Sequence, residues 1–218
     1  PSVAAALAGF QKAYPQAKVY SYEPISRDNE LLAAKAAFGT PARQVFDLKT
    51  AQVVLSFDAD LLGEHPNALR QINDWAQGRK SVDTTKTMNR LYVIESRYTL
   101  TGSVADHRLP ASTRDIEQLI LQLAYKAGLE SAQAGLEAGP RDFIDKVWED
   151  LTKNPGKALI AGGYNLRPEV LGVIAAINEK LGAFGATISL IPETDRPTHA
   201  ESIKALVDSM KAGNVDTL

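Results

Sequence analysis

The pattern of apolar residues has its clearest centre in the run Gln52–Phe57. Valine, leucine and phenylalanine follow one another there with one serine between them, without the period of a helix. Such a run predicts a strand buried on both faces, which is typical of a parallel sheet covered by helices. The run stops at Asp58 and Asp60. Their carboxylates are therefore expected at the carboxyl edge of the sheet, where open α/β sheets place ligands.

Strand-like and helix-like patterns alternate along the rest of the chain. Further strands are predicted at Lys18–Tyr22, Asn89–Glu95, Ala158–Ala161 and Thr187–Ile191. Helices are predicted over Ser2–Tyr14, Asp28–Phe38, Asn67–Gln77, Ser112–Ala127, Phe143–Leu151, Pro168–Leu181 and Thr198–Met210. This alternation predicts an α/β fold, a doubly wound, mainly parallel sheet with helices on both faces. We expect a single Rossmann-like domain over residues 1–218, cut from a longer chain.

Two helices carry more specific signals. In the helix Asn67–Gln77, the side chains of Leu69 and Ile72, together with either Trp75 or Ala76, are expected to face the core. Ser112, with Asp115 three residues later, is typical of a helix N-terminus capped by side chains.

Composition excludes several classes of function. The 218 residues include 24 basic and 26 acidic side chains, for a net charge of -2, and no basic block indicates nucleic acid as a partner. There is no cysteine, so disulfides, zinc thiolates and cysteine-bound iron–sulfur clusters are excluded within this chain. No apolar run approaches the roughly 18 residues of a membrane span.

The acid pair after the first strand has two interpretations. Asp58 and Asp60 have the spacing of a magnesium-dependent phosphatase, in which one acid is the nucleophile and the other a general acid. However, Leu61 and Leu62 follow the pair where haloacid-dehalogenase-like phosphatases have a glycine–threonine turn. The alternative is structural: both acids accept backbone N–H bonds in the turn that follows.

Two other signals are weak. Gly162 and Gly163 follow a predicted strand and could let a phosphate approach the backbone, but glycines also serve tight strand-to-helix turns. His65, His107 and His199 stand alone in loop or cap positions. None has a partner at metal-ligand spacing, and each is expected at the surface.

Three segments resemble the molybdopterin oxidoreductase superfamily. They are AQVVLSFDADLL (51–62), LYVIESRYTLTGSVADHRLPASTRDIEQLIL (91–121) and residues 157–209, which contain ALIAGGYNLRPEVLGVIAAINEKLGAFG. More narrowly, ADHRLP, INEKLGAFG and the terminal KAGNVDTL are similar to the cofactor-less domain of the alternative complex III B subunit and of related iron–sulfur polysulfide-reductase-like subunits.

The resemblance implies a set of nucleotide-contacting positions. They fall on Asp58, Asp60, Glu95, Arg97, Asp106 and Asp115. This chain departs from the family at Glu95-Ser96-Arg97, where the family has Asp-Pro-Arg, and at Thr113–Asp115, which lacks the usual Pro-Gly-Thr lead-in.

The resemblance also implies a function and partners. It implies a non-catalytic scaffold domain of a respiratory, electron-transferring oxidoreductase complex, with no cofactor in this chain. The partners would be an iron–sulfur ferredoxin-like domain of the same parent chain and other subunits of a quinol-oxidising membrane complex. The location would be peripheral, on the periplasmic side of the inner membrane. The alternatives are a functional lobe that binds molybdopterin guanine dinucleotide and the magnesium phosphatase.

Overall fold

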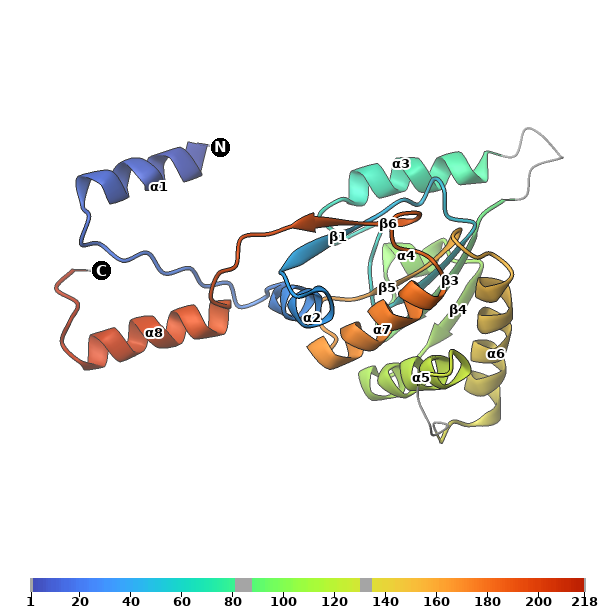
Figure 1. Ribbon diagram of the computed structural model, residues 1–218. Helices are drawn as coiled ribbons and strands as arrows, with labels where there is room; N and C mark the ends of the chain where they lie inside the picture. Colours follow the sequence, from blue (N-terminus) through green and yellow to red (C-terminus); the bar gives the residue numbers. More distant parts are fainter. Residues whose placement is uncertain (1, 81–87, 130–134, 218) are drawn as a thin grey trace. The chain divides into compact units, whose positions relative to one another are not determined.

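The chain forms two compact units (Figure 1). A computed structural model describes residues 2–80, 88–129 and 135–217. One unit comprises Pro1–Ser26 together with Arg196–Leu218, and the other Arg27–Asp195. The single domain over residues 1–218 stays a prediction, and the two units are described separately below.

The larger unit is built on a four-stranded parallel sheet with the order β4-β3-β2-β5. The strands are β2 (Val53–Phe57), β3 (Arg90–Glu95), β4 (His107–Pro110) and β5 (Ala158–Gly162). Leu55 of β2 pairs with Tyr92 on one side and Ile160 on the other. The predicted α/β fold is confirmed. The apolar run at Gln52–Phe57 forms the central strand β2, which is buried at all five positions.

Alternate residues of the strands contribute their side chains to two apolar cores, one on each face of the sheet. Leu55 and Phe57 of β2 pack with the helices on one face, and Val54 belongs to the core on the other face together with Trp75. Helices α5, α6 and α7 cover the first face and α3 the second (Figure 1). Their bounds are α3 Ala68–Arg79, α5 Thr113–Lys126, α6 Ala138–Thr152 and α7 Pro168–Lys180. Burial of the strand on both faces explains why its sequence shows no alternation.

Only one of the two strands of a second, smaller sheet was predicted from the sequence. The expected strand near Thr187–Ile191 exists as β6 (Ile188–Pro192), but it pairs antiparallel with β1 (Ala42–Phe46), outside the parallel sheet. The sequence of β1, ARQVF, has a mixed burial pattern and no clear apolar run. Helix α2 (Asp28–Phe38) precedes β1, with the predicted bounds.

Helix α3 faces the opposite way from the prediction. Leu69 is 87% exposed and Ile72 is 44% exposed, whereas Gln71 and Asp74 are buried with Trp75. Gly78 lies on the buried side, where a Cβ would stand 2.3 Å from the side-chain nitrogen Nδ2 of Asn89. The absence of a side chain there lets this polar face approach the sheet, so hydrophobicity alone gave the wrong face for all but Trp75.

The smaller unit contains helices α1 (Ser2–Ala13) and α8 (His199–Lys211). Thr198 and Glu201 form a complete capping box at the start of α8. The predicted strand at Lys18–Tyr22 is wrong, because the structure assigns no strand to these residues. Within this segment, the Ser21 N–H donates to Ser202 Oγ of α8 (3.0 Å), which is a side-chain contact and not a sheet ladder.

The outer edge of β5 is paired by side chains. Asn178 of α7 accepts from the Ile160 N–H (2.9 Å) and donates to the Ile160 carbonyl (2.8 Å). Thr187 Oγ1 donates to the carbonyl of Ala158 (2.9 Å). These contacts satisfy backbone groups that a further strand would otherwise bind.

Candidate functional site

Asp58 lies where β2 ends, at the point of the sheet where the chain order changes direction between β3 and β5. Its carboxylate accepts from the Ser96 N–H (2.8 Å), from Ser96 Oγ (3.0 Å) and from Asn165 Nδ2 (2.9 Å). Asp58 is also the non-glycine residue with positive φ (52°) among those described, a conformation that aspartate tolerates better than most residues. Asp58 thus ties together the loops that follow β3 and β5, in the crevice where such sheets often bind ligands.

Packing within the chain leaves no room for a side chain at Gly162 or Gly163. A Cβ at Gly162 would lie 2.5 Å from Leu171 Cδ2, and one at Gly163 would lie 2.2 Å from the Asp58 carbonyl oxygen. The Gly163 N–H donates to the carbonyl of Phe57 (2.8 Å). These contacts favour the structural interpretation of the glycine pair over a phosphate cradle.

Asp60 caps the turn after β2. Its Oδ1 accepts from the N–H (3.1 Å) and Oγ1 (2.7 Å) of Thr101, and Oδ2 accepts from the Glu64 N–H (3.2 Å). Thr101 belongs to α4 (Leu100–Ser103), a short helix in the connection between β3 and β4. Both aspartates of the predicted pair therefore accept hydrogen bonds from the loop after β3.

Glu95, the last residue of β3, is 1% exposed. One of its oxygens accepts from Arg108 Nε (2.5 Å) and the other from Thr99 Oγ1 (2.6 Å). A Cβ at Gly102 would lie 1.9 Å from Glu95 Oε1, so α4 closes directly over this carboxylate. Arg108 comes from β4, and its guanidinium lies 4.6 Å from the centroid of the Tyr98 ring.

The last two residues at this edge are more exposed. Arg97 forms an ion pair with Glu64. Asp115 lies in the first turn of α5, where Ser112 Oγ donates to Asp115 Oδ2 (2.6 Å) and accepts from the Asp115 N–H (3.2 Å). The predicted cap of α5 is confirmed.

Asp106 lies at the opposite end of the sheet. It precedes β4, and its carboxylate accepts from the Leu91 N–H at the start of β3 (2.8 Å) and pairs with Arg79 of α3. Burial raises the pKa of Asp106, but the hydrogen bonds and the charge of Arg79 outweigh burial and hold the pKa below its usual range. A ligand at the carboxyl edge would not reach it.

The structure therefore groups five of the six predicted positions at one edge, namely Asp58, Asp60, Glu95, Arg97 and Asp115, and separates Asp106 from them. Within residues 2–80, 88–129 and 135–217, no group of three or more His, Asp or Glu side chains has an arrangement that could hold a metal ion.

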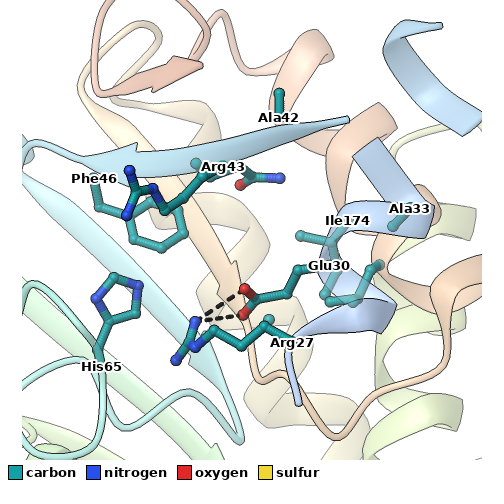
Figure 2. A pocket seen from close by; sticks show the side chains of 11 residues that line it. Arg27, Glu30, Ala33, Ala42, Arg43, Phe46, His65 and Ile174 are labelled. Carbon is teal, nitrogen blue, oxygen red and sulfur yellow. Dashed lines mark hydrogen bonds and ion pairs between the residues drawn. The ribbon is translucent and has the colours of Figure 1, made fainter. Parts of the chain in front are cut away.

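A small polar cavity, which sequence reasoning missed, lies between α2, β1 and the end of β5 (Figure 2). Its volume is about 40 Å³, which is room for about one water molecule. Arg27, Glu30, Arg43 and His65 bring charged or ionisable groups to it, and Phe46 lies beside the His65 ring (5.8 Å between centroids). The cavity cannot accommodate a nucleotide.

Arginines surround His65 in this cavity. Burial, followed by the positive charges of Arg27 and Arg43, lowers the pKa of His65 from 6.5 to about 4. Its Nδ1 accepts from the Asn67 N–H (3.1 Å). Arg27 donates to both oxygens of Glu30 (2.8 and 2.9 Å). Burial raises the pKa of Glu30, although Arg27 opposes the shift. His65 is thus a half-buried neutral ring and not the surface residue that its sequence context predicts.

Stability should fall on acidification because of His65. Since its pKa is lowered in the folded state from 6.5 to about 4, the unfolded chain binds a proton first as the pH drops through 6.5. The free energy of unfolding should therefore decrease by roughly 2 kcal/mol between pH 6.5 and 4, after allowance for solvent screening. Urea unfolding at several pH values measures this slope. His65→Asn should flatten it, whereas the exposed-site control His107→Asn should not, and equal slopes in both variants would contradict the assignment.

Comparisons with known proteins give little beyond the fold. No protein-family model matches the sequence, and no curated protein matches it. Among solved structures, the chain is similar to acetylene hydratase from Pelobacter acetylenicus, at 16% sequence identity and a TM-score of 0.48. The similarity covers 76% of this chain and 27% of that chain. Values this low assign neither a family nor an activity to the chain.

In the part of the chain that the structure describes, no helix is both long enough and apolar enough to cross a bilayer.

Proposed function

We propose that this chain is a molybdopterin-oxidoreductase-like α/β domain that acts as a scaffold and performs no catalysis of its own. The observation that carries the proposal is the use of the carboxyl-edge acids. Asp58, Asp60 and Glu95 all accept hydrogen bonds from the loop that follows β3. Acids committed to holding loops together are poorly placed to bind a guanine edge or a metal ion.

The order of the parallel strands supports the family part of the proposal. In dinucleotide-binding sheets the first strand is central, and the ligand lies where the chain order reverses beside it. Here β2 occupies that position, but Asp58 bridges Ser96 and Asn165 across the crevice. Both the strand order and the hydrogen bonds of Asp58 fit a former dinucleotide-binding crevice in which Asp58 now connects two loops.

In the proposed setting the domain positions electron carriers held elsewhere. Its partners would be an iron–sulfur ferredoxin-like domain of the parent chain and other subunits of a quinol-oxidising membrane complex, on the periplasmic side of the inner membrane. The chain would hold no molybdenum cofactor.

The alternative is a working lobe for molybdopterin guanine dinucleotide, and Asp115 is the observation that favours it. This side chain is exposed in the first turn of α5, where a carboxylate can accept two N–H bonds from guanine.

Calorimetric titration of the 218-residue chain with GDP separates the two proposals. The scaffold predicts no heat of binding up to about 1 mM ligand, equivalent to a binding free energy weaker than about -4 kcal/mol. Binding by the unmodified chain that Asp115→Ala abolishes would favour the cofactor-binding lobe instead. The matched control is Asp142→Ala, an exposed acid on α6, which should leave any binding unchanged.

Protein isolated from its native host provides an independent test of the scaffold. Metal and pterin analysis should find no stoichiometric molybdenum, tungsten or pterin bound to this chain. Cross-linking followed by mass spectrometry should connect it to cluster-bearing polypeptides. One pterin per chain would refute the scaffold proposal.

A further inference from the structure

An open groove runs between α2 and α7, which lie side by side (Figure 1). Its volume is about 720 Å³. Small residues line it, including Ala36 and Ala37 of α2 and Gly172 and Ala176 of α7. Along these small residues the backbone of another element can approach closely.

One end of the groove has an aromatic floor. Phe38, the last residue of α2, and Phe184, just after α7, meet edge to face with ring centroids 5.2 Å apart. Both rings line the groove and are half-buried. They present an apolar surface to an incoming side chain.

Two carboxylates border this apolar surface. Glu169 and Glu179 line the groove from α7 and are both exposed. They are ten residues apart, which corresponds to about 15 Å along a helix. Neither forms an ion pair with another residue in the described part of the chain.

Three cations at the ends of α2 and α7 have hydrogen-bond partners of their own. Arg167 donates to both oxygens of Glu117 (2.9 and 2.7 Å). Lys180 donates to the Ala127 carbonyl (2.7 Å), and Lys35 pairs with Asp195 (2.7 Å). The groove therefore carries two carboxylates without an ion-pair partner among the described residues, one toward each end of its apolar stretch, although the charge of Arg167 also acts on Glu169.

We infer that the α2/α7 groove is a docking site for a helix of a partner protein. The complementary helix has small or aliphatic side chains on one face and a lysine or arginine at two positions ten or eleven residues apart, because this spacing brings both cations to the glutamates. An extended segment would need its cations only about four or five residues apart. The inference rests on the proposed scaffold function, to which it adds the contact surface and the chemistry of the partner.

A pair of synthetic peptides tests the groove. The probe is a labelled, end-capped Ala/Leu helix of about 16 residues with two lysines ten positions apart. The control peptide carries glutamates at those two positions. In fluorescence anisotropy with the 218-residue chain at low salt, the lysine peptide should bind at least about tenfold more tightly, and added salt should weaken it.

Three variants of the chain locate the binding. Glu169→Lys combined with Glu179→Lys should weaken the lysine peptide by at least about tenfold. Gly172→Leu should abolish binding by filling the groove, since a Cβ at Gly172 meets no atom within 4 Å and the fold has room for it. Asp142→Lys on α6, which lines no part of the groove, is the matched charge control and should bind as the unmodified chain does. Circular dichroism confirms that each variant is folded.

Equal binding of the two peptides, binding by neither, or full binding to Gly172→Leu would each overturn the groove assignment. These outcomes are distinct from failure of the scaffold proposal, which depends on pterin, metal and cross-linked partners in native material. Cross-links to cluster-bearing polypeptides from other faces, with no peptide bound, would leave the scaffold standing without the groove.

Discussion

Phe57→Ala is expected to lower the free energy of unfolding by about 4 kcal/mol, the largest effect of any substitution considered. Phe57 is fully buried at the end of β2, between Ile94 of β3 and Gly162 of β5. Truncation removes the ring and leaves a cavity that the two flanking strands cannot close, because both are held in register with β2.

The urea midpoint, at an unchanged m-value, measures this loss, and a melting temperature about 8–16 °C lower should accompany it. The matched control is Leu69→Ala on α3. Leu69 is 87% exposed, so its truncation should change stability by no more than about 0.5 kcal/mol. A large loss at Leu69 with a small one at Phe57 would contradict the structural assignment of both residues.

Glu95→Ala is expected to cost about 3 kcal/mol, because it removes one partner of a buried ion pair. Arg108 Nε and Thr99 Oγ1 would both lose their acceptor on a carboxylate that is 1% exposed. The same substitution should loosen α4, since Gly102 lies directly against Glu95. Urea unfolding measures the loss, and hydrogen exchange at the α4 amides reports the loosening.

Two further variants isolate the cause. Glu95→Gln keeps an acceptor for Thr99 and should cost less than Glu95→Ala. Arg97→Ala breaks the neighbouring but exposed ion pair with Glu64, so it should cost under about 1 kcal/mol. If Arg97→Ala and Glu95→Ala were equally damaging, burial would not be the source of the effect.

The parallel sheet was predictable because its strands are buried on both faces. The apolar runs that became β2, β3 and β5 stand out for that reason. Strands β1 and β4 do not stand out, because they are only partly buried and lack a continuous apolar run. Tertiary pairing, and not local pattern, makes them strands.

Part of the candidate site was also predictable. Parallel strands end at a common edge, so Asp58, Asp60 and Glu95 could be placed there from the sequence. Their hydrogen bonds could not be foreseen, because the donors come from a loop whose path depends on the folded chain and, for Glu95, also from the weakly patterned strand β4. Asp106 entered only through the family resemblance. It precedes β4 and does not follow a strand, so it lies away from this edge, and β4 had no sequence signal.

The environment of His65 lay beyond sequence reasoning for a related reason. Arg27 and Arg43 stand far from it in the chain and meet it only where β1 and α2 fold over the end of β5. A titratable residue acquires its chemistry from such neighbours. No local motif encodes them.

The side-chain hydrogen bonds to the backbone of β5 affect whether copies of the chain can join edge to edge. An unpaired edge strand is a template on which another chain can add a strand, and amyloid-like growth begins at such edges. At β5, Asn178 and Thr187 already occupy backbone groups of Ile160 and Ala158. At the other edge, β4 has only four residues, carries Arg108 and ends in Pro110, which has no N–H to donate. The sheet is thereby protected at both edges against the addition of a strand from another chain.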